Sequence, residues 1–274
     1  PGAAGTTPAV GGDAGAAGGR PPVPFVGREV ELGVLTTAWE QASQGARHVV
    51  VITGEAGIGK SRLAGEAALR VAAAGGQVLC GRCDQEAIGP YQPLVEALDG
   101  LVATTPADEL PSLGPGAAAE LAAILPGIGG APPPSLPDRG RLFAAVTDLV
   151  AALAAARPLL LVLDDLQWAD DDTLLLLRHL LRRAGSAPVL VVAISRDHDL
   201  DPGSALADVI HALDRDGWVR RRPLRGLGEA DVRRLLGHLL GAGDHRAAAR
   251  RIAAETAGNP FLVTELGVST DAGG

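Results

Sequence analysis

Gly54-Glu55-Ala56-Gly57-Ile58-Gly59-Lys60-Ser61 is the stretch that decides the fold of this chain, because it matches the pattern G-x-x-x-x-G-K-[ST] in the required setting. The β-branched residues 48–53 before it predict a strand. The Ala/Leu-rich residues 61–74 after it predict a helix that ends at Gly75. Glycines allow successive backbone N–H groups to surround a phosphate, and a helix N-terminus favours negative charge. The sequence therefore predicts a phosphate-binding loop between a strand and a helix.

Lys60 is the only lysine of the chain, and every other member of the 24 Lys and Arg residues is an arginine. A compact, flexible ammonium suits a phosphate cradle better than a planar guanidinium does. We therefore expect Lys60 to reach the β- and γ-phosphates of ATP and to act in catalysis, and Ser61 to bind Mg²⁺. The loop residues expected to contact the nucleotide are Gly54, Glu55, Ala56, Gly57, Ile58, Gly59, Lys60, Ser61 and Arg62.

A second motif ends in two carboxylates. Residues 159–163 form an apolar run typical of a buried strand, and Asp164 and Asp165 follow it directly. Ligands bind at the carboxyl ends of strands in open α/β sheets. We expect Asp164 to hold Mg²⁺, directly or through water, and Asp165 to orient and polarise the water that attacks the γ-phosphate.

Composition excludes several classes of protein. The 274 residues are enough for one or two domains with a buried core. Lys and Arg number 24 against 32 Asp and Glu, and the formal charge of −8 makes nucleic acid an improbable default partner. Two cysteines are too few for a disulfide scaffold, and no apolar run of about 18 residues lacks a charge. We therefore expect a cytoplasmic protein with no membrane partner. Methionine is absent, which favours a fragment.

Strand and helix patterns alternate along the chain, which predicts a parallel α/β sheet covered on both faces. The Gly/Ala/Pro-rich residues 1–24 are expected to be a disordered tail. Residues 25–225 are expected to form the core, residues 226–268 a small helical lid subdomain, and residues 269–274 a truncated tail. Residues 104–138 are interrupted by proline and glycine, and we expect them to be a surface insertion. The predicted strands are 48–53, 77–80, 159–163, 189–194 and 218–221.

Four motifs together resemble those of the signal-transduction ATPases with numerous domains (the STAND class). The likeness is strongest to the ATPase module of large ATP-binding LuxR-type transcriptional regulators. The motifs are Phe25-Val26-Gly27-Arg28-Glu29, the phosphate-binding loop, Leu163-Asp164-Asp165-Leu166-Gln167-Trp168-Ala169-Asp170, and Gly258-Asn259-Pro260-Phe261. They span most of the chain from residue 25 to residue 261.

The resemblance implies an AAA+-like P-loop NTPase core whose parallel sheet has the strand order 5-1-4-3-2, followed by a helical lid. It implies that Arg196, after the fourth strand, reads the γ-phosphate and takes part in catalysis. It also implies that Val26, Gly27 and Arg28 lie beside the adenine, while Pro260 approaches the base from the lid. The implied cofactors are ATP and Mg²⁺.

Regulators of this kind continue into a winged helix, helical repeats and a DNA-binding helix-turn-helix. We therefore expect DNA binding to belong to missing C-terminal domains of a parent chain, and not to this fragment itself. The resemblance also implies a nucleotide site that is often completed by homo-oligomerisation.

Alternative functions stay open at this point. The first expectation is a switch that binds ATP or ADP and hydrolyses ATP slowly. The second is an oligomerisation or scaffold module that keeps a nucleotide bound without turnover. A small-molecule kinase could use the same loop, but Arg196 and the Trp168-Ala169-Asp170 extension disfavour it.

Cys80-Gly81-Arg82-Cys83 has the spacing of a redox motif or of half a zinc site. No second Cys or His pair accompanies it, so we expect an ordinary strand end. The family likeness alone suggests that Arg82 faces the nucleotide.

Overall fold

The structure, a computed structural model, describes residues 23–46, 48–86, 89–106, 109–129, 138–183, 185–241 and 243–271. Apart from Val23 and Pro24, the expected disordered tail of residues 1–24 lies outside the described residues. The same is true of residues 272–274 of the expected C-terminal tail.

Five parallel strands form one sheet in the order β2-β3-β4-β1-β5. Read from the other edge this is 5-1-4-3-2, so the expected α/β fold and strand order are confirmed. Three central strands are fully buried or nearly so, because helices cover both faces. The strands are β1 (His48–Thr53), β2 (Gln77–Arg82), β3 (Leu159–Asp164), β4 (Val189–Ile194) and β5 (Val219–Pro223).

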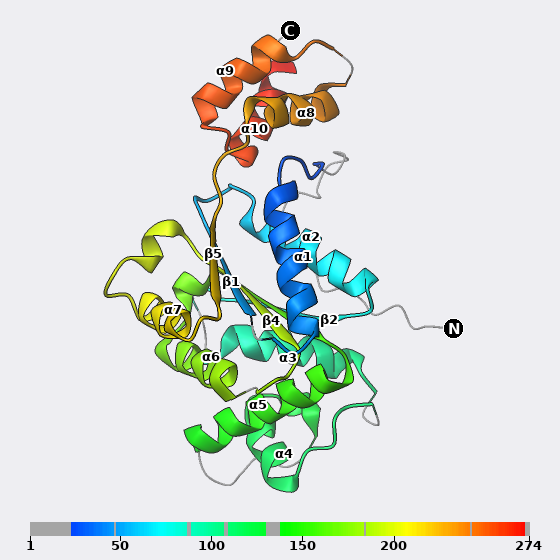
Figure 1. Cartoon of the computed structure of the whole chain (residues 1–274), viewed down its shortest axis with the longest axis vertical. Coiled ribbons are helices and arrows are strands. Elements are labelled where there is room, and N and C mark those ends of the chain that lie inside the picture. The colour runs from blue at the N-terminus through cyan, green and yellow to red at the C-terminus, as the bar shows by residue number, and fades with distance from the viewer. Residues whose placement is uncertain are drawn as a thin grey trace.

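The helices form a layer on each side of the sheet (Figure 1). Val50 and Ile52 of β1 pack toward α1 and α2, whereas Val49 and Val51 of the same strand pack toward α3, α5, α6 and α7. The core helices are α1 (Glu29–Ser43), α2 (Lys60–Ala73), α3 (Gln92–Thr104), α4 (Pro115–Ala122), α5 (Arg139–Ala156), α6 (Asp171–Arg183) and α7 (Ala205–Arg215); short 3-10 helices are η1 (Pro126–Ile128), η2 (Leu166–Trp168) and η3 (Asp197–Leu200).

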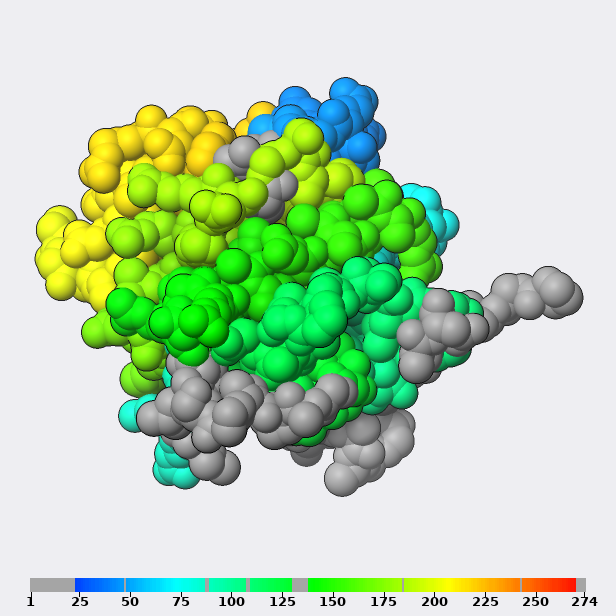
Figure 2. All heavy atoms as spheres, turned by 90° about the horizontal axis from the view of Figure 1, so that it is seen from below, coloured from blue at the N-terminus to red at the C-terminus, as the bar shows by residue number. Residues whose placement is uncertain are grey.

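Part of the described residues 109–129 contributes to the core, which corrects the expectation of a surface insertion for that part of residues 104–138. Leu121 at the end of α4 and Leu125 just after it are each 0% exposed and belong to the larger hydrophobic cluster. The helix packs against α5, and Figure 2 shows the green residues of α4 and α5 on one continuous face of the molecule. Proline and glycine interrupt this segment, but its two leucines at i and i+4 spacing still fill the core.

Three helices follow the sheet and have a hydrophobic cluster of their own: α8 (Glu229–Leu240), α9 (Arg246–Thr256) and α10 (Pro260–Asp271). Figure 1 shows them at one end of the molecule, joined to the core by the chain that leaves β5. Val23 and Val26 pack against this cluster, so the start of the described chain contacts these C-terminal helices. Helix α10 continues through Asp271, beyond the expected end of the lid at residue 268.

None of the described helices is long and apolar enough to cross a membrane.

We predict that Leu125→Ala lowers the free energy of unfolding by about 2–5 kcal/mol, because it removes buried methyl groups and leaves a cavity. Urea denaturation of the purified chain measures the change. Leu69→Ala is the matched control, since Leu69 lies on α2 with 52% of its surface exposed. Equal stability of the two variants would show that residues 104–138 do not support the core.

Candidate functional site

The loop between β1 and α2 carries three glycines at positive φ, and two of them explain its shape. Gly59, with φ of 97°, precedes the first residue of α2. Gly57 has φ of 75°, and a Cβ there would lie 2.9 Å from the Cβ of Phe261. Side chains at these positions would be strained, so the glycines let the loop curve closely beside α10.

Lys60 is 9% exposed and points back into this loop. Its Nζ donates hydrogen bonds to the carbonyl oxygens of Gly54, at 2.8 Å, and Glu55, at 2.9 Å. Burial lowers the pKa of Lys60, while the carboxylates of Asp164 and Asp165 act in the opposite direction. The ammonium group therefore lies among backbone carbonyls and close to both acids, where an anionic ligand of the loop would meet it.

Ser61 and Asp164 are brought together although 103 residues separate them in sequence. The Ser61 hydroxyl donates to Oδ2 of Asp164 at 2.6 Å, and the N–H of Asp165 donates to Oδ1 at 2.9 Å. Burial raises the pKa of Asp164 above its ordinary value, and the Ser61 hydrogen bond partly opposes that shift. The pair supplies two hard oxygen atoms at the carboxyl edge of the sheet.

These two oxygens fit a Mg²⁺ site of the kind that shares its ligands with phosphates and water. Within the described ranges, no group of three or more His, Cys, Asp or Glu side chains could hold a metal ion by itself. A Mg²⁺ ion bound by Ser61 and Asp164 would therefore need further ligands from a bound nucleotide and from water.

Asp165 is held from two sides. Its Oδ2 accepts hydrogen bonds from Nε of Arg82 at 2.9 Å and from a terminal guanidinium nitrogen of the same residue at 2.8 Å. Its Oδ1 accepts from Nε2 of Gln167 at 2.9 Å. The backbone of Asp165 has φ of 54°, which is uncommon for a residue other than glycine. Asp165 thus has a fixed carboxylate in a strained turn, which is typical of functional sites.

Arg82 is a site residue that the sequence analysis left out of its candidate set. It is the last residue of β2 and lies in register with Asp164 of the adjacent strand. Its hydrogen bond to Asp165 raises the pKa of the guanidinium. The family likeness suggested that Arg82 faces the nucleotide, but the predicted strand of residues 77–80 ended two residues before it, whereas β2 extends to Arg82.

Cys80 lies within β2, and Cys83 directly follows the end of that strand. Burial raises the pKa of both thiols to about 12, and each is a free cysteine. Reactive cysteines have a lowered pKa. The expected ordinary strand end is therefore confirmed for Cys80 and Cys83.

Arg196 follows the end of β4, and its guanidinium carbon lies 5.9 Å from the ring centroid of Trp168. This is the geometry of a cation–π interaction. The charge of Arg196 also lowers the pKa of Lys60, so the two cations lie near each other. The neighbouring Ser195 is 1% exposed, and within the described part of the chain its hydroxyl oxygen has no hydrogen-bond partner.

Arg28 links the loop to the start of the C-terminal helices. Its guanidinium donates to the carbonyl oxygens of Ile58, at 3.1 Å, and Arg225, at 2.7 Å, and forms an ion pair with Glu31 at 3.1 Å. The residue is 5% exposed. These bonds give Arg28 a bracing role; that it also lies beside an adenine with Val26 and Gly27 stays a prediction.

Asn259 joins α10 to the same loop. Its side-chain amide donates to the carbonyl oxygen of Ala56 at 2.9 Å, and its Oδ1 accepts from the N–H of Phe261 at 3.1 Å. The Phe261 N–H also lies 3.4 Å from the carbonyl oxygen of Gly57. The sequence analysis named Pro260 from this motif, but the hydrogen bonds to the loop come from its two neighbours.

The structure therefore gathers the expected residues of the loop, of the Asp164-Asp165 pair and of Arg196 at one edge of the sheet. It adds Arg82, Gln167 and Asn259 to them. A phosphate-bearing ligand, a divalent cation and a polarised water are the chemistry that this set can support.

Comparison with known proteins agrees with this arrangement. A family model described as "AAA ATPase domain" matches residues 24–192. No curated protein matches the sequence.

Several solved structures have a similar fold. One is a STAND protein with a tetratricopeptide repeat sensor from Pyrococcus horikoshii, with a TM-score of 0.50 and 19% identity over 89% of this chain and 30% of that chain. A second is DnaA from Aquifex aeolicus bound to AMPPCP, with a TM-score of 0.50 and 13% identity over 84% of this chain and 57% of that chain.

A third is the Drosophila ORC bound to DNA, with a TM-score of 0.56 and 14% identity over 89% of this chain and 55% of that chain. This chain thus spans less than two thirds of each of these structures. At such low identity the likeness concerns the fold.

We predict that Asp164→Asn stabilises the ligand-free chain at pH 7. Since the folded-state pKa of Asp164 is raised, its stabilising contribution is present below the ordinary carboxylate pKa and is lost as pH rises through the raised value. At pH 7 the ionised carboxylate is therefore unfavourable in the fold, and the neutral amide avoids that cost. The urea midpoint of Asp164→Asn should exceed that of the unmodified chain at pH 7, with a smaller gap near pH 4.

The control for this comparison is Asp148→Asn on the exposed side of α5, which should change the midpoint little at either pH. A lower midpoint for Asp164→Asn at pH 7 would show that the charge of Asp164 stabilises the ligand-free fold.

Proposed function

We propose that this chain, which belongs to the AAA ATPase domain family, is a signal-transduction switch that binds ATP with Mg²⁺ and hydrolyses it slowly. The observation that supports this most directly is the meeting of Lys60 with the Ser61 and Asp164 pair beside Asp165. The site therefore contains a cation that can bind phosphates, oxygen ligands that can bind a metal, and a carboxylate that can orient a water molecule.

Binding would use the loop of residues 54–62. Backbone N–H groups and the N-terminus of α2 receive the phosphates, and Lys60 exchanges its carbonyl partners for phosphate oxygens. Ser61 and Asp164 hold the metal, and Mg²⁺ when bound neutralises charge on the β- and γ-phosphates. The proposed flanks of the base are residues 26–28 on one side and Pro260 on the other.

Hydrolysis would use Asp165 to accept a hydrogen bond from the attacking water. A carboxylate has about four lone-pair positions, so Asp165 keeps acceptor capacity beside Arg82 and Gln167. These two partners fix the direction in which the carboxylate faces. Arg196, held against Trp168, is the proposed reader of the γ-phosphate.

Signalling would pass from the core of residues 25–225 to the lid of residues 226–268. Asn259 contacts the loop through Ala56, and Arg28 contacts both Ile58 and Arg225. A phosphate that reshapes the loop therefore acts on groups that hold the lid, which is how nucleotide switches move one element relative to another.

The wider role is that of one module in a multidomain regulator. The motif resemblance to LuxR-type regulators supports it, as does the similar STAND protein, of which this chain covers 30%. The sensor of that protein is a tetratricopeptide repeat. The proposed partners are ATP or ADP, C-terminal domains of a parent chain and further copies of this chain, with DNA contacted by another part of the parent.

A nucleotide-holding scaffold without turnover is the second candidate. The observation that favours it is the engagement of both oxygens of Asp165, by Arg82 and by Gln167. If these bonds persist with ATP bound, the carboxylate has less freedom to position a water. The Asp165 experiment below separates the two functions.

Lys60→Ala should weaken ATP and ADP binding in the presence of Mg²⁺ by on the order of 100-fold, since charge-assisted bonds to phosphate are lost. Calorimetric titration measures the affinity. Arg70→Ala, which removes an exposed cation from the last turn of the same helix, should bind as the unmodified chain does. Equal affinities for Lys60→Ala and Arg70→Ala would contradict nucleotide binding at this loop.

Asp165→Asn should keep ATP affinity within about threefold and lower phosphate release by on the order of 100-fold, because the amide is a poor proton acceptor. Phosphate release under saturating ATP and Mg²⁺ measures turnover. Asp171→Asn, at the exposed start of α6, is the control and should keep turnover. Normal turnover in Asp165→Asn would remove that residue from its role, and absence of release from the unmodified chain would favour the scaffold.

A further inference from the structure

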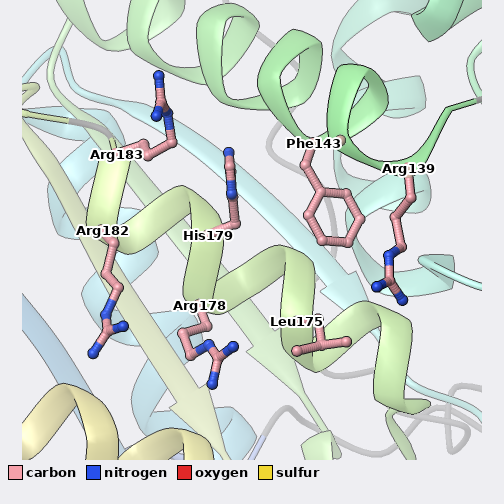
Figure 3. Close-up of a pocket in the computed structure, with 8 residues that line it drawn as sticks. Arg139, Phe143, Leu175, Arg178, His179, Arg182 and Arg183 are labelled. Atoms are coloured by element: carbon pink, nitrogen blue, oxygen red, sulfur yellow. The ribbon is translucent and has the colours of Figure 1, made fainter.

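A cleft of about 450 Å³ lies between α5 and α6, outside the set of residues that surrounds the phosphate-binding loop. In Figure 3, His179 and Arg183 point from α6 toward the helix that carries Phe143, whereas Arg178 and Arg182 leave α6 in the opposite direction. This volume falls in the range of pockets that hold small organic ligands. The lining residues are Arg139, Gly140, Phe143, Leu175, Arg178, His179, Arg182 and Arg183.

The charge of this cleft contrasts with that of the chain. Four of its eight lining residues are arginines, in a protein with a formal charge of −8. A local concentration of one sign in a cleft attracts ligands of the other sign. The cleft is therefore suited to an anion.

Two of the four arginines already have acidic partners at the rim. Arg139 forms an ion pair with Asp172 at 3.2 Å, and Arg182 forms one with Asp216 at 3.4 Å. Among the described residues, none forms an ion pair with Arg178 or with Arg183. A guanidinium group can bind a carboxylate through two parallel hydrogen bonds.

Two aromatic rings and a leucine form part of the lining of the cleft. Phe143 is 7% exposed, and its ring meets the ring of His179 edge-on, with 5.6 Å between the centroids. Figure 3 shows the two rings facing each other from α5 and α6, with Leu175 on the same side of α6 as the cleft. A flat apolar group can lie against these side chains.

His179 adds an unused polar atom. Its Nε2 is buried and has no hydrogen-bond partner within the described part of the chain. Burial lowers the pKa of His179, and the charge of Arg183 lowers it further, which favours the neutral ring. A buried polar atom without a partner is uncommon in folded proteins, and a ligand atom would supply the missing partner.

We propose that this cleft binds a small organic anion with a flat apolar body and two acid groups. The acid groups pair with Arg178 and Arg183, while the body lies against Phe143 and Leu175. In Figure 3 the two guanidinium groups lie on opposite sides of His179, which suits acid groups at separate edges of one ligand. The volume of about 450 Å³ is in the range of pockets that hold small organic ligands, and the proposal is made for such a molecule.

Calorimetric titration with isophthalate, a flat dicarboxylate, tests the proposal. The neutral isophthalamide of the same shape should bind at least about tenfold more weakly, because it cannot form charge-assisted bonds. The double variant Arg178→Gln with Arg183→Gln should weaken isophthalate binding by at least about tenfold. ADP and Mg²⁺ are added in parallel titrations, so that anion binding at the phosphate loop is recognised by competition.

The matched control is Arg70→Gln with Arg250→Gln, which removes the same charge from exposed positions on α2 and α9. It should bind isophthalate as the unmodified chain does, and thermal unfolding checks that both double variants are folded. Equal isophthalate affinity in the two double variants would overturn the proposal.

Tighter binding of a deca-glutamate peptide that depends on Arg178 and Arg183 would overturn it in favour of an acidic protein partner. The affinity of the same variants for ADP is measured separately. A loss of isophthalate binding with normal ADP affinity therefore says nothing against the proposed ATPase function.

Discussion

The hydrogen bond from Ser61 to Asp164 is the contact on which the rest of the site depends. It joins the first turn of α2, which follows β1, to the last residue of β3, and these two strands are not neighbours in the sheet because β4 lies between them. Adjacent strands are about 4.8 Å apart, so side chains from β1 and β3 can meet only beyond the end of the strand between them. The strand order thus creates the crevice at the carboxyl edge, and the two motifs reach it from opposite sides.

The buried charges in this crevice lower the stability of the ligand-free protein. Burial opposes the charge of both Lys60 and Asp164, as the directions of their pKa shifts show. Such groups are tolerated when they have hydrogen-bond partners, and the loop carbonyls and Ser61 provide them. The apolar strands β1, β3 and β4 beneath the site offset the remaining cost. A site that is unfavourable when empty is one that gains stability from its ligand.

The sequence was sufficient to predict the features that depend on local patterns, such as the bounds of strands. The strands of residues 48–53 and 189–194 have the predicted bounds, because short β-branched runs between turn residues have few other solutions. It was insufficient where long-range contacts decide. Asn259 meets Ala56 across 203 residues, and Arg82 meets Asp165 across 83, so neither bond has a local signal. The burial of Leu125 was missed because proline and glycine nearby suggested a surface segment.

The phosphate-binding loop also contacts the segments that lead into the C-terminal helices, and in the proposed switch these hydrogen bonds would couple phosphate binding to those helices. Asn259 bonds to Ala56, and Arg28 bonds to Ile58 and to Arg225. The carbonyls of Ala56 and Ile58 belong to the loop, whereas that of Arg225 lies between β5 and α8. Lys60 donates a hydrogen bond to the carbonyl oxygen of Glu55, immediately before Ala56. In the proposed binding mode, the ammonium group would give up this bond for one to a phosphate. A phosphate that draws Lys60 away therefore frees the backbone next to the lid contact. A hydrogen bond between neutral groups contributes about 0.5–1.5 kcal/mol, and one from a charged group such as the Arg28 guanidinium about 1.5–3 kcal/mol. In the proposed switch, a bound phosphate would shift the balance between two positions of the lid by changing these few bonds.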